Sequence, residues 1–267
     1  MNPAYPGLAA AAFYLIGAYF QFGKLKQKAA ATEPRLFAVA VLAAVAHALT
    51  EYNVVVTAAG IQLGVLSVAS LIALTLVVFL LIASIWQPLQ NLFVLVFPLA
   101  AIAVLASLFG HGSVTPRTEF GEGLLAHILI SIVAYTILAM AAVQSILLAL
   151  QERSLRHKSI TGFVTLLPPL QTMETMLFQL LWVGLIALTL AIGSGFLFLT
   201  DMFAQSVVPH TVLASASWVT FAILLAGRYL FGWRSTLATR ATLVGFVLLI
   251  LAYFVTRFVL EILLGSA

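Results

Sequence analysis

Eight long apolar runs, separated by short polar segments, constrain this 267-residue chain more than any other feature. They cover residues 5–22, 34–50, 63–85, 89–109, 122–150, 173–200, 209–231 and 239–264. A helix needs at least about 17 mostly apolar residues to cross a bilayer, and every run is long enough. Only 7% of the residues are charged, against about 25% in a soluble domain. The sequence therefore predicts an all-α, polytopic transmembrane bundle of about eight helices, with residues 1–267 as a single integral membrane domain.

The basic residues predict how this bundle is oriented. Ten of the twelve fall on one side of an eight-span arrangement, namely Lys24, Lys26, Lys28, Arg35, Arg153, Arg156, Lys158, Arg228, Arg234 and Arg240. Only Arg117 and Arg257 fall on the other side. Cytoplasmic loops carry an excess of Lys and Arg, so both termini are expected outside. The pI of about 9.6 follows from this arrangement, and we expect the lipid bilayer, not nucleic acid, as the partner.

Residues with metal-binding chemistry gather on the outer side of this arrangement. Four of the five histidines fall there, namely His47, His111, His127 and His210, whereas His157 belongs to a basic cytoplasmic loop. Neutral imidazole is a ligand for copper, for zinc and for the iron of haem. Two histidines from different helices can fill both axial positions of a haem. His127 and His210 open the fifth and seventh apolar runs at matching depth, so we expect this pair to be the metal ligands. The alternative is that each of them caps a helix or bonds a neighbouring carbonyl at the membrane interface.

The other candidate residues carry weaker signals. His111 lies in a loop that imposes little geometry, and His47 is either a ligand at a second site or a buried hydrogen-bonding partner. Ser131 and Tyr135 follow His127 at steps of four, which places them on the same helical face. Arg257 either pairs with Glu261 or anchors a carboxylate such as a haem propionate, and Arg117 lies within reach for the same task. Residues 193–195, Gly-Ser-Gly, are typical of close helix packing.

The absence of cysteine excludes disulfides, thiol redox chemistry and covalent haem attachment. Neither a Walker motif nor an HExxH metalloprotease motif is present in the sequence. The first residues, MNPAYPG, lack the basic region of a signal peptide, so we expect the first helix to be retained.

Four blocks carry a resemblance to a known family: LAHILISIVAYTILAMAAVQSILL, LLPPLQTMETMLFQLLWVGLIALTLAIGSG, HTVLASASWVTFAILLAGRYLFGWR and ATLVGFVLLILAYFVTRFVLEILL. In this order they resemble the cytochrome c assembly family of membrane proteins, and in particular its short YpjD-like members. The resemblance implies haem handling at the periplasmic face of a bacterial inner membrane. It implies a non-covalent, b-type haem held by outward-facing histidines, with His127 and His210 where such a pair is expected. His47 matches a histidine on the second helix of YpjD-like chains.

One departure from the family narrows the expected activity. The tryptophan-rich periplasmic segment of the haem lyases is missing from the sequence, and the outer loops are too short to contain it. We therefore expect a haem-binding, non-enzymatic role in cytochrome c assembly or haem transport, with other membrane or cytochrome assembly proteins as partners. The alternatives are a small-molecule permease and an accessory membrane subunit that binds no haem. The permease is disfavoured because no inverted repeat and no midplane ionisable cluster was found.

Overall fold

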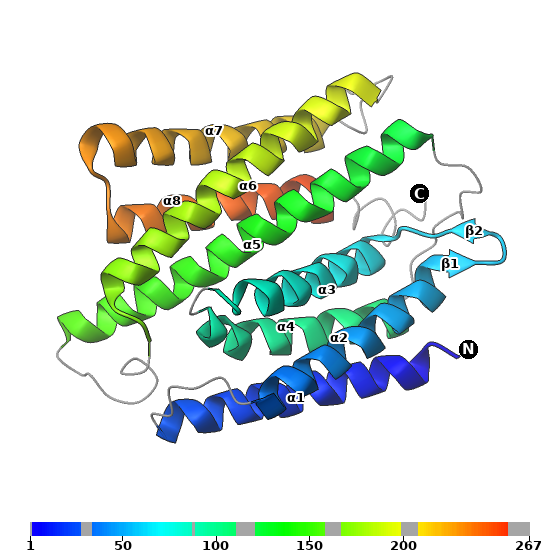
Figure 1. The fold of residues 1–267 in the computed structure, drawn as a ribbon. Coiled ribbons are helices and arrows are strands. Elements are labelled where there is room, and N and C mark those ends of the chain that lie inside the picture. The colour runs from blue at the N-terminus through cyan, green and yellow to red at the C-terminus, as the bar shows by residue number, and fades with distance from the viewer. Residues whose placement is uncertain are drawn as a thin grey trace. The chain divides into compact units, whose positions relative to one another are not determined.

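The computed structural model describes residues 2–27, 34–86, 89–110, 121–157, 167–198 and 208–255. These residues form eight α-helices, a small hairpin of two strands with two residues each, and two short helical turns (Figure 1). The helices are α1 (Ala4–Gln27), α2 (Pro34–Val55), α3 (Val65–Ala83), α4 (Phe93–Phe109), α5 (Glu122–Arg156), α6 (Leu170–Phe198), α7 (Val208–Phe231) and α8 (Ser235–Ile250). The short elements are β1 (Val56–Thr57), β2 (Gly60–Ile61), the 3₁₀ turn η1 (Gln90–Leu92) and the π-helical turn η3 (Leu251–Val255). The predicted all-helical class is confirmed.

Seven of the eight helices, α2 to α8, are long and apolar enough to cross a membrane, with the seventh span continuing through η3. α1 forms as predicted but is not among these seven. It carries three tyrosines and, near its end, two lysines, which explains its lower apolar character. The helices fall into two compact units, α1 to α4 and α5 to α8.

In the first unit, α1 packs closely against α4. Two glycines of α1 allow this approach: a Cβ added at Gly17 would lie 2.7 Å from the ring of Phe97, and one added at Gly7 would meet Leu108. Gln21, on the same helix, is buried and donates through Nε2 to the backbone oxygen of Gln90 at 2.9 Å. Such side-chain hydrogen bonds to backbone oxygens hold helices together where water is absent.

α2 extends beyond the apolar run 34–50 and ends at Val55, one turn farther than the sequence suggested. That extra turn carries Glu51, whose side chain is only 2% exposed. The hairpin follows at once, with Val56 paired to Ile61. Gly60 has a φ of 127° in this tight turn, a backbone conformation that residues other than glycine rarely adopt.

In the second unit, α5 and α7 run in one direction and α6 and α8 in the other (Figure 1). Several polar side chains on one helix donate to backbone oxygens of another. Gln144 Nε2 donates to the Met173 oxygen at 3.1 Å, and Ser217 Oγ donates to the Gly245 oxygen at 2.7 Å. The helices approach closely there, since a Cβ at Gly245 would lie 2.7 Å from the Phe221 ring.

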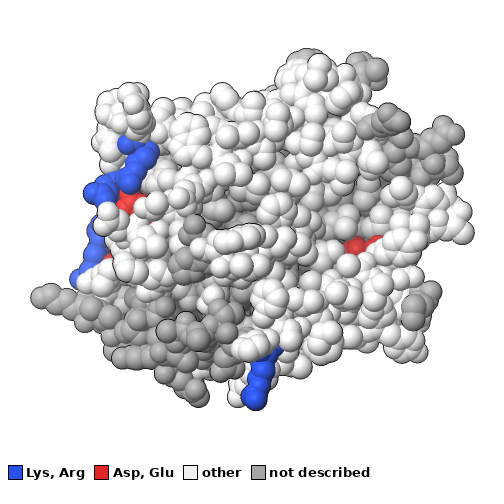
Figure 2. All heavy atoms as spheres, viewed as in Figure 1, with Lys and Arg blue, Asp and Glu red and all other residues white. Residues whose placement is uncertain are grey.

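One end of this second unit is basic. α7 ends before Gly232, which has a φ of 65°, and the N–H of Trp233 donates to the Gly227 oxygen at 3.3 Å. The buried carboxylate of Glu174 on α6 binds Arg228 at 2.6 Å and Arg234 at 3.4 Å. Blue side chains gather beside the α7–α8 turn in Figure 2, while the visible flanks of the helices carry almost no charge. Flanks without charge suit contact with lipid.

Candidate functional site

The candidate site lies at the other end of the second unit, where α5 and α7 begin and α6 and α8 end. A cavity of about 40 Å³ lies between these four helices. Its polar lining comes from His127, Ser131, Tyr135 and His210, with Thr211 at its edge, and its other walls are apolar. A cavity of this size has room for about two or three water molecules. The histidine pair predicted from the sequence therefore faces one shared space.

His127 is held by α6. Its Nδ1 lies 3.0 Å from Ser194 Oγ, and that hydroxyl donates its own hydrogen to the Ala191 backbone oxygen at 2.8 Å. The Ser194 oxygen can then only accept from the ring, so Nδ1 of a neutral His127 carries the hydrogen. The lone pair of the ring is left on Nε2, which is the atom that would bind a metal.

His210 is held in the same way by the end of α8. Its Nδ1 lies 3.0 Å from the backbone oxygen of Ala252. Because a carbonyl oxygen only accepts, Nδ1 is the donor and the lone pair of the neutral ring lies on Nε2. Ala252 belongs to the π-helical turn η3, and π turns within helices are common at functional sites. Both histidines therefore adopt the Nδ1–H form that ligand histidines adopt when a neighbouring oxygen orients them.

Tyr135 contributes its ring to the cavity wall, because its hydroxyl is already engaged. That hydroxyl donates to the Leu249 backbone oxygen at 2.7 Å, and the side chain is 7% exposed. The ring meets Tyr253 and Phe254 edge-on, at centroid distances of 6.3 Å each. His210 also meets Tyr253 edge-on at 6.2 Å. Tyr135 therefore ties α5 to α8 beside the histidines.

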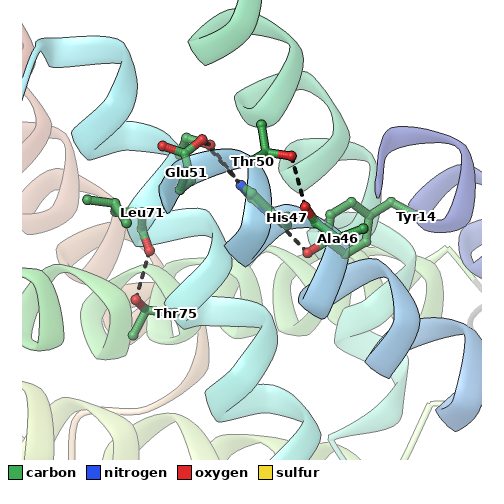
Figure 3. A network of polar contacts seen from close by, with 8 residues as sticks. Tyr14, Ala46, His47, Thr50, Glu51, Leu71 and Thr75 are labelled. Carbon is green, nitrogen blue, oxygen red and sulfur yellow. Dashed lines mark hydrogen bonds and ion pairs between the residues drawn. The ribbon is translucent and has the colours of Figure 1, made fainter. Parts of the chain in front are cut away.

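His47 lies in the first unit, and both of its ring nitrogens are engaged (Figure 3). Nδ1 lies 3.0 Å from the Tyr14 hydroxyl, and Nε2 lies 2.7 Å from Ser70 Oγ. Of the two roles that the sequence left open, this geometry favours the buried hydrogen-bonding partner. The other three candidates, His111, Arg117 and Arg257, lie outside the described residues.

The donor set suits haem better than zinc. Within the described ranges, no three His, Cys, Asp or Glu side chains come together as a metal-binding group. A zinc site takes three or four protein ligands, whereas a haem takes at most two axial ones. The pair His127 and His210 matches the second requirement.

Two contributors to this site could not be recognised in the sequence. Ser194 belongs to the Gly-Ser-Gly segment, which was interpreted as helix packing, yet its hydroxyl orients His127. The Ala252 carbonyl is a backbone group, so no residue type marks it. The sequence carried one signal for Ser194. Residues 193–195 lie near the end of the apolar run 173–200, on the same side of the membrane as His127 and His210.

The comparisons with known proteins bear on this geometry. The family described as cytochrome C assembly protein matches residues 36–264. The chain belongs to the cytochrome c assembly family. The matched region runs from α2 to α8 and contains His47, His127 and His210. The match confirms the resemblance described in the sequence analysis.

Two relatives are similar over large parts of the family region. Inner membrane protein YpjD of Escherichia coli is 29% identical over 225 residues, which are 84% of this chain and 85% of that protein. An uncharacterized 28.8 kDa protein of Azospirillum brasilense is 36% identical over 141 residues, 52% of each chain. No solved structure matches this chain.

Proposed function

We propose that this protein binds one non-covalent, b-type haem between α5 and α7, with Nε2 of His127 and of His210 as the two axial ligands. The observation that carries the proposal is the shared orientation of the two rings. Each donates its Nδ1 hydrogen to a fixed oxygen, Ser194 Oγ or the Ala252 carbonyl, so that each lone pair lies on Nε2. Membership of the cytochrome c assembly family supports haem as the bound group. We assign no catalytic residue.

The cavity places a condition on this proposal. At about 40 Å³ it holds water but not a porphyrin, so haem binding requires the apolar walls around the histidines to move apart. The apolar walls include Leu188 and Leu249, whose side chains suit contact with a flat macrocycle. When bound, the iron would provide a redox-active centre, and the protein's own part is to hold and orient the ligands. The role that fits is haem binding or transfer to partner proteins during cytochrome c assembly.

Titration of the purified protein with ferric haem tests the proposal. We expect a Soret band of bis-imidazole, low-spin character that saturates at about one haem per chain. The matched control is the same titration in detergent micelles without protein, which reports non-specific partitioning. A spectrum identical to that of haem in empty micelles would contradict the proposal and leave the permease or the accessory subunit as the function.

We further propose that this is a multi-pass inner membrane protein, as its relative YpjD is named, with both termini and the histidine end periplasmic. The distribution of basic residues supports this orientation. Reporter fusions after Lys28, Lys158 and Arg234 should report a cytoplasmic location, and fusions near Arg117 and the C-terminus a periplasmic one. A cytoplasmic C-terminus would rule out the eight-span arrangement.

A further inference from the structure

The first unit contains a buried polar chain that the haem site does not use. It links Tyr14 on α1, His47 and Glu51 on α2, and Ser70 on α3. All four side chains are at most 2% exposed. Figure 3 shows Glu51 and Tyr14 on opposite sides of the His47 ring. Polar groups are costly to bury within a membrane protein, and those that persist there usually serve a function.

The hydrogen bonds in this chain all run in one direction when Glu51 is ionised. Ser70 Oγ donates to Glu51 Oε1 at 2.6 Å, so its oxygen must accept from His47 Nε2 at 2.7 Å. Nε2 then carries the hydrogen of the neutral ring, and Nδ1 accepts from the Tyr14 hydroxyl at 3.0 Å. Every donor therefore points toward the Glu51 carboxylate.

The far end of the chain is closed. The Tyr14 ring lies against Phe97, at a centroid distance of 5.7 Å, and is fully buried. No described polar side chain continues the sequence of hydrogen bonds beyond Tyr14. The chain therefore suits a proton that is held at one position, and not a proton that is passed along the chain and beyond Tyr14.

The Glu51 end leads to a second hydroxyl. Among the described residues, Glu51 Oε2 and Ser107 Oγ on α4 are both buried, and Ser107 lies beside the Glu51 carboxyl. The Ser107 hydroxyl can donate to Oε2 when the carboxyl is ionised, and it can accept from Oε2 when that oxygen carries a proton. Both protonation states of Glu51 can therefore be held at this position.

Among the described residues, no fixed positive charge faces Glu51. α3 and α4 carry no charged residue. The basic residues Lys24, Lys26 and Arg35 belong to the opposite ends of α1 and α2. The described titratable groups that face the carboxyl are His47, whose Nε2 lies 3.9 Å from Oε1, and beyond it Tyr14. Within the part of the chain that the structure describes, Glu51 is therefore a buried carboxyl without a fixed cation beside it.

We propose that this chain is a buried proton-binding site, in which Glu51 takes up and releases one proton on the side of the membrane where α2 ends. The proton adds to Oε2, forming one O–H bond and breaking none within the chain. Ser70 and His47 respond because their hydrogen bond to Oε1 weakens when the carboxylate becomes a neutral acid. The site makes the first unit sensitive to protons, and it uses none of the residues proposed as haem ligands.

Infrared difference spectroscopy between acidic and alkaline conditions tests the site on the full-length protein. At acidic pH the wild type should show carbonyl bands of protonated carboxylic acids, because the chain has eight acidic side chains. One component, that of Glu51, should be missing in Glu51→Gln while the others remain. It should persist in Glu152→Gln, the matched control, because Glu152 pairs with Arg156 instead. A difference spectrum of Glu51→Gln that retains every component of the wild type would overturn the proposal.

A second measurement does not depend on the folding of Glu51→Gln. The nitrogen chemical shifts of His47, assigned by comparison with His47→Gln, should change over the same pH range as the carbonyl band. In Ser70→Ala they should no longer follow that band, because the hydroxyl between the ring and the carboxyl is gone. Shifts that do not change in the wild type, or that follow the band equally in Ser70→Ala, would contradict the chain.

Discussion

Replacing both His127 and His210 by alanine is expected to abolish specific haem binding, so that the Soret spectrum becomes that of haem in empty micelles. The reason is that both axial ligands disappear. The remaining walls of the cavity are apolar apart from the hydroxyls of Ser131, Thr211 and Tyr135, and that of Tyr135 already donates to the Leu249 oxygen. Membrane insertion should survive because hydrophobicity drives it. Absorbance spectroscopy at a fixed haem-to-protein ratio measures the loss, and circular dichroism checks that helix content is retained.

The single variants and a distant histidine complete this experiment. His127→Ala and His210→Ala should each give a five-coordinate or high-spin spectrum. Haem affinity should fall by more than about 100-fold, because loss of a residue that only hydrogen-bonds to a metal ligand already costs up to about that much. His157→Ala, an exposed histidine at the end of α5, is the matched control and should leave the spectrum unchanged. His111→Ala should retain most of the haem. If the double variant kept the wild-type spectrum, the ligands would have to be sought at His47 and His111.

The second large effect concerns Ser194. Ser194→Ala removes the oxygen that accepts from His127 Nδ1 at 3.0 Å, so the ring is free to rotate and to exchange its hydrogen between nitrogens. Loss of such an orienting group lowers metal affinity by about 10- to 100-fold. A competition titration with a haem-binding protein of known affinity measures this change.

Ser131→Ala provides the control for that variant. Ser131 lines the same cavity on the same helix as His127, and no hydrogen bond to either histidine is found for it. Both variants remove one hydroxyl oxygen, but that of Ser131 does not orient a histidine, so Ser131→Ala should change haem affinity by less than about threefold. Equal losses in both serine variants would show that cavity polarity, and not orientation of His127, governs binding.

The spans and the histidine pair could be predicted from the sequence because both depend on local pattern. Apolar runs of sufficient length form helices in any membrane protein, since each backbone group must be satisfied within its own segment. His127 and His210 open two such runs from one side, so their depth follows from helix geometry alone. The structure adds that they line one cavity.

The orienting groups and the buried chain could not be predicted because they depend on which helices pack together. The apolar run 34–50 stops one residue before Glu51, so the sequence pattern gave no reason to place Glu51 among packed helices. The actual helix continues to Val55, which carries Glu51 into the packed interior beside Ser70. His47 and Glu51 are four residues apart, a spacing that places them on one face once the helix is known to continue. The Ala252 carbonyl depends on the π turn of η3, for which the sequence gives no marker.

Electron paramagnetic resonance of the ferric, haem-loaded protein tests the central proposal most directly. With histidine labelled by ¹⁵N, the wild type should give a low-spin signal in which two histidine nitrogens couple to the iron. His127→Ala and His210→Ala should each retain coupling to one. A wild-type signal with one histidine nitrogen or none, or a two-nitrogen signal that survives in the double variant, would contradict the assignment of His127 and His210 as the axial pair.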